Sequence, residues 1–406
     1  MDESDNVVPL PSAPDAIELR HLRAFVAVAE ELNFSRAAAR LYLSAPALSR
    51  QIQALERLVG CDLLRRNTHR AELTIAGEAL LDCARNLLRD LDRGVSATRS
   101  VGGEMHQRIA RFWAPVLDLA RPDIDLQALR DASESLQAQF TPPPDAAVRS
   151  VNAGGVPSLQ LTTRPGEPPT LLHLHGGAFV MGSAFGFRPL AGTLAVAAQT
   201  NLLLPEYRLA PEHPYPAALE DALRAYLWLL DSGVPPGRVT ISGDSSGGHL
   251  AMTLLLSLKE QDMPLPGGAL LMCPIADITC ASMTPPPPET PPVMTAEMAR
   301  ALIDLYLGGH PIDDPLLNPL TADLSGLPPL LIQVATGDFV TAEAQALADH
   351  ARAQGVDVRL ELYPADTHVF HIFWSFLPEA ADALAQAGRF AHDVAAGHTL
   401  ETGTGC

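Results

Sequence analysis

Arg238-Val-Thr-Ile-Ser-Gly-Asp-Ser-Ser-Gly-Gly-His249 combines an expected β-strand, a tight turn and the start of an expected helix. Within it, Gly243–Gly247 fits the Gly-x-Ser-x-Gly pattern, in which a serine is exposed on a sharp strand-to-helix turn. Glycines are needed there because larger side chains would clash and block access to the serine. The pattern also occurs by chance, but its place between a strand and a helix favours Ser245 as a nucleophile.

A second expected strand, 170–174, runs directly into His175-Gly-Gly-Ala178. The backbone N–H groups of Gly176, Gly177 and Ala178, together with that of Ser246, are predicted to form an oxyanion hole that stabilises a tetrahedral intermediate. Alanine at the third position is acceptable because the N–H group matters and the side chain does not. An ordinary Gly-Gly turn is the simpler alternative.

The chain order serine, acid, histidine predicts where the other members of a catalytic triad stand. Asp338 follows the carboxyl end of an expected strand at 329–335, and a further strand at 356–363 leads to His368. His368 is predicted to take the Ser245 proton as general base, and Asp338 to orient the imidazole.

Two alternatives stay open at this point. His371 is a rival base, because it stands three residues after His368. Asp366 is a rival acid, but it is too near His368 in sequence to lie at the end of the preceding strand.

From about residue 141 to 394, short β-rich runs alternate with helices, which predicts an α/β fold with a mostly parallel sheet and helices on both faces. This part of the chain, about 107–395, resembles the bacterial hormone-sensitive lipase family of carboxylesterases, which have the α/β-hydrolase fold. The resemblance rests on His175-Gly-Gly-Ala-Phe, Tyr207-Arg-Leu-Ala-Pro-Glu-His-Pro-Tyr-Pro-Ala-Ala-Leu, Gly243-Asp-Ser-Ser-Gly-Gly, Gly337-Asp338 and His368-Val-Phe.

That resemblance implies a serine ester hydrolase with no metal and no organic cofactor, acting on short acyl or aryl esters. It also implies a helical cap over the site from residues 107–140, with 281–306 as a further candidate. The chain departs from the family pattern at Asp338-Phe-Val, where Asp-Pro-Leu is usual, and at Val369, where glycine is usual. Val369 is bulkier and puts the size of the substrate in doubt more than catalysis.

Residues 17–95 have a different, helical pattern rich in Ala, Leu and Arg. The pattern predicts a first helix from Leu19, a second capped by Ser35, and a third capped by Ser44 that ends at Gly60. Extended pieces at 62–65 and 71–74 and a long helix reaching about Asp92 follow. Two short helices, a third helix and a small basic wing are typical of a winged helix-turn-helix, whose third helix enters the DNA major groove. A small helical bundle with solvated arginines is the alternative.

These residues resemble the DNA-binding domain of LysR-type transcriptional regulators, through Leu19-Arg-His-Leu-Arg-Ala-Phe-Val-Ala-Val-Ala-Glu-Glu, Phe34-Ser-Arg-Ala-Ala, Ser44-Ala-Pro-Ala-Leu-Ser-Arg-Gln-Ile-Gln-Ala-Leu-Glu, Gly60–Arg66 and Leu73-Thr-Ile-Ala-Gly-Glu. The resemblance implies that the last long helix pairs two subunits. Ala45 stands where the family usually has a base-reading glutamine, which puts the target sequence in doubt. The two-lobed effector domain usual in that family is absent. The candidate DNA contacts are Ser35, Arg36, Ser44, Ala45, Pro46, Ser49, Arg50, Gln53, Arg66 and Arg70.

The formal net charge of −19 argues against general attraction to nucleic acid or to anionic membranes. The charge is uneven, because residues 17–95 carry twelve Arg against ten acidic residues. The acidic start does not fit a secretory signal, and no apolar run approaches eighteen residues, so a cytoplasmic protein with no membrane partner is expected. The five cysteines show no metal-binding spacing.

The sequence as a whole predicts a disordered lead (1–16), a DNA-binding domain (17–95), a linker (96–106), a hydrolase domain (107–398) and a disordered tail (399–406). Its partners are expected to be an ester, double-stranded DNA and further copies of the chain, as a homodimer or homotetramer. Two other functions stay open. In one, the hydrolase fold only senses a ligand for a transcription regulator, with little turnover. In the other, the N-terminal domain serves dimerisation alone.

Overall fold

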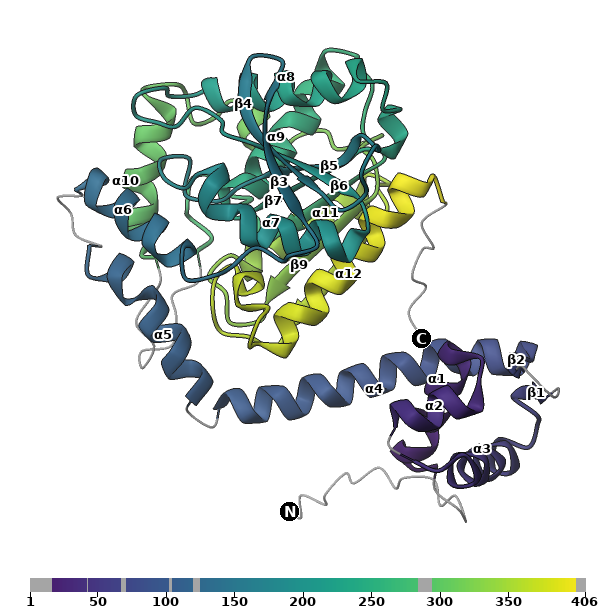
Figure 1. The fold of residues 1–406 in the computed structure, drawn as a ribbon. Helices are drawn as coiled ribbons and strands as arrows, with labels where there is room; N and C mark the ends of the chain where they lie inside the picture. The colour runs from purple at the N-terminus through teal and green to yellow at the C-terminus, as the bar shows by residue number, and fades with distance from the viewer. Residues whose placement is uncertain are drawn as a thin grey trace, which may run out of the picture. The chain divides into compact units, whose positions relative to one another are not determined.

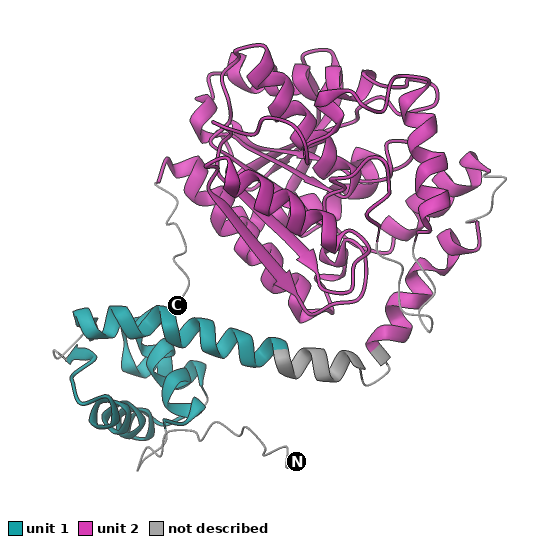
Figure 2. Ribbon diagram, turned by 180° about the vertical axis from the view of Figure 1, so that it is seen from behind, with its two compact units in different colours: residues 1–95, 406 teal, residues 96–405 magenta. Residues whose placement is uncertain are grey.

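The computed structural model describes residues 17–41, 43–66, 71–101, 104–119, 125–283 and 294–398. They form two compact units that divide between Val95 and Ser96, each with its own buried hydrophobic cluster (Figure 2). The predicted lead and tail, at 1–16 and 399–406, lie outside the described residues. Among the residues described, no helix is both long enough and apolar enough to cross a membrane.

The first unit contains a helix-turn-helix followed by a two-stranded wing (Figure 1). On the third helix, Leu48, Ile52 and Leu55 recur at helical spacing and are fully buried in one cluster with Phe25. The elements are α1 (Leu19–Glu31), α2 (Phe34–Arg40), α3 (Ala45–Val59), the antiparallel strands β1 (Leu64–Arg66) and β2 (Ala71–Leu73), and α4 (Ile75–Val101). The predicted winged helix-turn-helix layout is therefore confirmed.

Both ends of α3 are as predicted, but the N-terminal cap of α2 is not. Ser44 caps α3 through its Oγ, which accepts the Ala47 N–H at 3.3 Å, and Gly60 ends the helix with a φ of 82°. The prediction of Ser35 as the cap of α2 is wrong. Asn33 takes that position, and its Oδ1 accepts the Arg36 N–H at 3.0 Å.

The long helix α4 extends beyond its predicted end at Asp92. It continues to Val101, so the backbone of 96–101, expected to be linker, is helical. Gly94 does not stop the helix, because a single glycine in a helix interior costs only about 1 kcal/mol. Residues 102 and 103 lie outside the described part of the chain, and α5 begins at Glu104.

The second unit is built on an eight-stranded sheet in the order β10-β9-β8-β7-β5-β6-β4-β3. Strand β4 is antiparallel to both of its neighbours, and the other pairs are parallel. The strands are β3 (Ala147–Ala153), β4 (Val156–Thr162), β5 (Pro169–Leu174), β6 (Asn201–Pro205), β7 (Thr240–Asp244), β8 (Gly268–Met272), β9 (Leu330–Ala335) and β10 (Val358–Tyr363). The central strands β6 to β9 are buried along their whole length, which explains the nearly continuous apolar sequences of β6, β8 and β9.

Helices cover both faces of this sheet (Figure 1). Helices α7 (Ala184–Ala198) and α12 (Pro378–Ala396) pack on each other, and α8 (Ala217–Asp231) and α9 (Ser246–Glu260) form a second pair. Helix α11 (Thr341–Ala353) packs against β9 and β10, and α10 (Ala296–Leu307) follows β8 in the chain. The predicted α/β fold with a mostly parallel sheet is confirmed.

Ahead of β3, two helices occupy the stretch that was expected to form the cap. They are α5 (Glu104–Leu117) and α6 (Leu126–Gln137), so the described part of the expected helical cap consists of two helices.

Candidate active site and DNA-binding residues

Ser245 lies at the tip of the turn between β7 and α9. Its backbone has a φ of 53° and a ψ of −120°, a sparsely populated conformation for a residue with a side chain. A Cβ at Gly243 would lie 2.2 Å from the Gly247 carbonyl oxygen, and one at Gly247 would lie 2.0 Å from the Leu174 carbonyl oxygen. The glycines flanking the serine are therefore required by close backbone packing.

The structure brings Ser245, His368 and Asp338 together in one hydrogen-bonded chain. His368 Nε2 lies 2.7 Å from Ser245 Oγ, and His368 Nδ1 lies 2.9 Å from both carboxylate oxygens of Asp338. All three residues are buried, with no more than 9% of their surface exposed. The carboxylate fixes which ring nitrogen carries the proton, and this leaves Nε2 free to accept a proton from the serine hydroxyl.

The two rival residues lie outside this chain of hydrogen bonds. His371 Nε2 lies 3.1 Å from Gln333 Oε1, and burial lowers the pKa of His371 to about 3. Asp366 is an exposed residue whose Oδ2 lies 3.0 Å from His106 Nδ1. Neither the alternative base nor the alternative acid is placed to serve Ser245.

The backbone after β5 turns sharply beside Ser245. Gly177 has a φ of 122°, followed by 51° at Ala178, and a Cβ at Gly177 would lie 2.1 Å from the Met181 carbonyl oxygen. Ser246 is the first residue of α9, so its N–H has no acceptor within the helix.

One member of the predicted oxyanion hole needs correction. The Gly176 N–H donates to Asp244 Oδ1 at 3.0 Å, so it is not available to a substrate oxygen. Gly176 is needed for a different reason, because a Cβ there would lie 2.3 Å from Asp244 Oδ2. Gly177, Ala178 and Ser246 are the candidates that remain.

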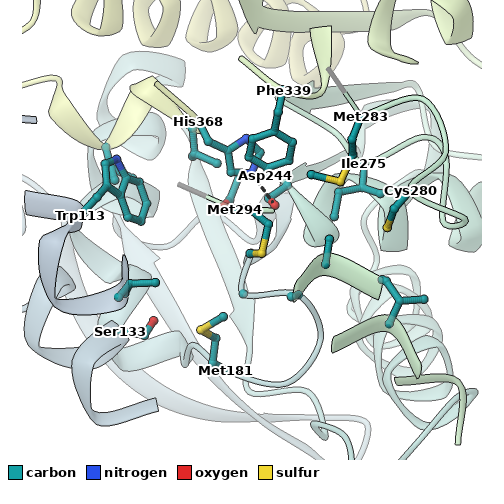
Figure 3. Close-up of a pocket in the computed structure, with 18 of the residues that line it drawn as sticks. Trp113, Ser133, Met181, Asp244, Ile275, Cys280, Met283, Met294, Phe339 and His368 are labelled. Atoms are coloured by element: carbon teal, nitrogen blue, oxygen red, sulfur yellow. Dashed lines mark hydrogen bonds between the residues drawn. The ribbon is translucent and has the colours of Figure 1, made fainter. Parts of the chain in front are cut away.

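A cavity of about 110 Å³ opens on Ser245 and His368 (Figure 3). Its lining is mainly apolar and comes from several parts of the chain. Trp113 and Val116 of α5 and Leu136 of α6 line it, as do Met294 and Ile303 from the 281–306 stretch. Both segments that were expected to cover the site therefore contribute side chains to the pocket.

Most of the predicted DNA contacts are exposed residues of the first unit. On α3, Pro46, Arg50 and Gln53 are exposed on the side opposite Leu48 and Ile52. Ser35, Arg36, Ser44 and Ala45 are also exposed, and Ser49 is half-buried. Arg36 forms an ion pair with Glu31 at 3.3 Å. Arg70 and the side chain of Arg66 lie outside the described residues.

Comparison with known proteins identifies the larger unit. A family model for the alpha/beta hydrolase fold matches residues 171–372. An acetyl-hydrolase of Streptomyces hygroscopicus is 42% identical over 223 residues, which cover 54% of this chain and 74% of that protein. The chain belongs to the α/β-hydrolase fold family. An esterase of Acinetobacter venetianus is 34% identical to this hydrolase over 266 residues, covering 65% of this chain and 88% of the esterase.

Comparison with solved structures narrows the family to which the hydrolase is similar. It is similar to an esterase from the bacterial hormone-sensitive lipase family, with a TM-score of 0.66 and 34% identity over 70% of this chain and 97% of that one. The esterase EstE5, in a crystal soaked with p-nitrophenyl butyrate, gives a TM-score of 0.64 and 33% identity over 72% and 99% of the two chains. The predicted resemblance to the hormone-sensitive lipase family is confirmed.

The N-terminal unit matches a second, unrelated family. A model for bacterial regulatory helix-turn-helix proteins of the LysR family matches residues 19–78. The hydrolase thus carries a LysR-type helix-turn-helix domain in the same chain, as the sequence motifs predicted.

Several residues that support the site were not predicted from the sequence. Tyr207, from the Tyr-Arg-Leu-Ala-Pro-Glu motif, donates its hydroxyl to the His175 carbonyl oxygen at 2.7 Å and stacks on the His175 ring at 4.2 Å. Burial lowers the pKa of His175 to about 4, so this imidazole is neutral. The pair holds the strand end that leads into Gly177, which gives that motif a structural role beside the site.

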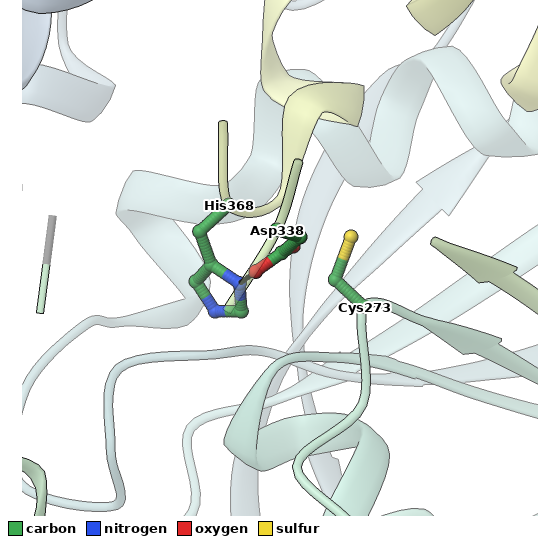
Figure 4. Close-up of side chains that lie close together, drawn as sticks. All are labelled: Cys273, Asp338 and His368. Carbon is green, nitrogen blue, oxygen red and sulfur yellow. Dashed lines mark hydrogen bonds and ion pairs between the residues drawn. The ribbon is translucent and has the colours of Figure 1, made fainter. Parts of the chain in front are cut away.

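Cys273 is a further unpredicted neighbour of the triad (Figure 4). It is fully buried directly after β8, and its Sγ lies within 4.8 Å of a carboxylate oxygen of Asp338 and a ring nitrogen of His368. Burial and the nearby carboxylate raise the pKa of Cys273 well above its usual range, so the neutral thiol is the form present. Within the described part of the chain, Cys273, Asp338 and His368 are the one group of three whose donor atoms could hold a metal ion.

Glu343 lines the pocket together with Asp277. Its Oε2 accepts the Asp277 N–H at 3.0 Å, and only 1% of the residue is exposed. Burial raises the pKa of Glu343 to about 8, so its carboxyl group is protonated at neutral pH. Nothing in the sequence pattern indicates this, because the burial comes from contacts between distant segments.

Proposed function

We propose that the chain is a serine carboxylesterase that hydrolyses short acyl or aryl esters. The observation that carries the proposal is the continuous hydrogen-bonded chain Ser245–His368–Asp338 at the base of an apolar cavity. Ser245 is the nucleophile, His368 the general base and Asp338 the group that orients His368. Residues 107–398 form the catalytic domain, with 107–140 as its cap.

In the first half of the reaction, Ser245 Oγ attacks the ester carbonyl carbon while its proton moves to His368 Nε2. The carbonyl oxygen becomes an oxyanion, which the N–H groups of Gly177, Ala178 and Ser246 stabilise. When the tetrahedral intermediate collapses, the bond to the alcohol oxygen breaks and His368 donates its proton to that oxygen. The alcohol leaves, and an acyl group remains bonded to Ser245.

Water then completes the cycle. His368 Nε2 accepts a proton from a water molecule, whose oxygen attacks the acyl carbon and again forms an oxyanion in the same place. The bond to Ser245 Oγ breaks, the proton returns to that oxygen, and the carboxylic acid leaves. Asp338 stabilises the imidazolium in both halves without taking its proton.

The size and lining of the pocket support short substrates. A cavity of about 110 Å³ is small, and its side chains are mainly apolar. Val369, which replaces the usual glycine after the base, also lines it and takes up further space. The related esterase EstE5 was soaked with p-nitrophenyl butyrate in the crystal, which makes this ester a suitable first substrate to test.

The test is turnover of p-nitrophenyl esters of graded chain length by the wild-type chain and Ser245→Ala. Loss of the nucleophile lowers kcat by about 10⁴–10⁶-fold. A serine-reactive phosphonate is expected to label Ser245, as peptide mass spectrometry can show. The exposed Ser232 provides the matched control, and Ser232→Ala is expected to keep full activity. A Ser245→Ala chain that keeps more than a few per cent of wild-type activity contradicts the nucleophile assignment.

Failure of the wild-type chain to turn over any ester of the series would favour the other candidate, a regulator that uses the pocket as a ligand sensor. The intact Ser245, His368 and Asp338 favour turnover, since a pure sensor does not need all three.

We further propose that residues 17–95 bind double-stranded DNA as a dimer. The exposed face of α3 offers Arg50 and Gln53 to the major groove, as in other helix-turn-helix proteins. On α4, Ile75, Ala79, Cys83 and Leu87 are exposed at four-residue intervals, which supports pairing through this helix. Because DNA is the partner, we propose a cytoplasmic location.

A gel-shift series on a genomic fragment tests this second activity. Binding is expected to weaken steeply with salt, because bound phosphates release counterions. Arg50→Ala is expected to weaken it, while a Leu87→Glu chain is expected to lose the dimer in sedimentation and with it most affinity. No retardation even at low salt would leave dimerisation as the role of this unit.

A further inference from the structure

Helix α5 contacts the segment that carries the proposed catalytic base. The Trp113 indole N–H donates to Thr367 Oγ1 at 2.9 Å, and Thr367 directly precedes His368. Phe112, the preceding residue of α5, packs edge-on against Phe373 at 5.0 Å between ring centroids. The two contacts hold this helix against the chain on both sides of His368.

A second polar contact of α5 lies nearby and is weaker. His106 Nδ1 lies 3.0 Å from Asp366 Oδ2, but the two side chains are 40% and 54% exposed. Exposed pairs of this kind contribute little because water competes for both groups. By contrast, Thr367 is 2% exposed, and the Trp113 ring that donates to it packs against Phe112 and Phe373.

Trp113 also faces the pocket. It lines the cavity from the side opposite Cys280 and Met283 in Figure 3, whereas Thr367 is not among the lining residues. The two ends of this hydrogen bond can therefore be tested separately, because Trp113 lines the pocket and Thr367, which does not, directly precedes the base in the chain.

We propose that Trp113 is a positioning residue for His368. Its indole N–H holds Thr367, and through Thr367 it keeps His368 in register with Ser245. The inference rests on the proposed esterase function. The 2.7 Å contact between His368 and Ser245 depends on the placement of the 366–368 backbone, and a misplacement of about 1 Å can cost about 100-fold in rate. The pocket face of the same indole contacts bound substrate, so Trp113 also influences KM.

The experiment uses the full-length chain, p-nitrophenyl butyrate and the variants Trp113→Phe, Thr367→Val and the double variant. Thr367→Val keeps the side-chain shape and loses the acceptor, so kcat is expected to fall about 5–20-fold with little change in KM. Trp113→Phe loses the donor and part of the pocket wall, so kcat is expected to fall similarly while KM rises. Thr367→Ser restores the hydroxyl and is expected to restore kcat.

The double variant separates positioning from general destabilisation. The effects of replacing the two partners of one hydrogen bond are not additive. The kcat of the double variant is therefore expected to lie at most about twofold below that of the worse single variant. His106→Ala is the control from the same helix and is expected to stay within about twofold of wild type. Thermal unfolding of every variant identifies any chain that fails to fold. If Thr367→Val does not fold, Thr367→Ser still tests whether the hydroxyl keeps kcat.

Unchanged kcat in both Thr367→Val and Trp113→Phe would overturn the inference, as would full additivity in the double variant. Either result leaves the esterase proposal intact provided that Ser245→Ala is inactive. If Ser245→Ala keeps its activity, the proposed function itself fails.

Discussion

Replacing Asp338 by asparagine tests the assignment of the triad acid without changing the shape of the side chain. Both carboxylate oxygens lie 2.9 Å from His368 Nδ1, and only 4% of the residue is exposed. Asparagine can present its NH₂ group to Nδ1, which would force the ring proton onto Nε2. Nε2 would then face Ser245 Oγ as a donor and could not accept the serine proton.

The expected loss follows from that change of tautomer and from the lost charge. The equivalent replacement in serine proteases lowers kcat by about 10⁴-fold. Because Asp338 is almost completely buried, water cannot easily take the place of its carboxylate. We therefore expect kcat for p-nitrophenyl butyrate to fall by about 10³–10⁴-fold, or about 4–5.5 kcal/mol of transition-state stabilisation.

Asp366→Asn is the matched control, since Asp366 stands two residues from His368 and yet pairs with His106. Its kcat is expected to stay within about threefold of wild type, because an exposed pair contributes little. Initial rates at saturating ester, with unfolding temperatures for both variants, decide the comparison. Substantial activity in Asp338→Asn together with a large loss in Asp366→Asn would show that the acid has been assigned to the wrong residue.

Three further outcomes follow from the site. The buried Glu343 has its pKa raised to about 8, so the folded chain keeps a proton that the unfolded chain releases above about pH 4.5. The free energy of unfolding should therefore fall between about pH 5 and 8, by at most about 1.4 kcal/mol per pH unit, and Glu343→Gln should flatten that slope in urea titrations. An unchanged slope would mean that Glu343 is ionised in the folded chain. Gly177→Ala, whose Cβ would lie 2.1 Å from a carbonyl oxygen, should lower kcat about 10²–10³-fold, while Gly166→Ala, with open space around it, should not. Equal activity of the two variants would argue against an oxyanion role for this turn. Cys273→Ser keeps a polar group beside Asp338 and should stay near wild type, whereas Cys273→Ala should lose about 3–10-fold in kcat. An unchanged kcat in Cys273→Ala would show that Cys273 does not support the triad.

The side chains that meet at the site could be predicted because strand ends and tight turns restrict residue types strongly. Ser245 needs glycines on either side, and the parallel strands β9 and β10 end on the same edge of the sheet, where Asp338 and His368 follow. Chain order and these backbone constraints are local properties, and they are visible in a single sequence.

Directions of individual N–H groups could not be predicted in the same way. Gly176 and Gly177 look equivalent in the sequence, but the structure separates them, because Asp244 accepts the Gly176 N–H and only Gly177 has a positive φ. The cap of α2 was misassigned for a similar reason, since Asn33 and Ser35 are both good caps two residues apart. The contact of Trp113 with Thr367 spans 254 residues, and no local pattern encodes it.

In the chain, helix α5 stands between the proposed DNA-binding unit and the sheet of the hydrolase. A ligand shifts DNA affinity only if it binds one DNA-binding state more tightly than another, and the effect must then hold in both directions. In sequence, α5 begins three residues after the end of α4, and it contacts both the pocket and the backbone of the base through Trp113. An ester is consumed by an active hydrolase, so it cannot act as a steady signal, whereas the product acid persists. Ser245→Ala holds the ester uncleaved, so an ester effect on DNA affinity should last longer in that variant. An effect seen only with the acid would instead make turnover itself the switch.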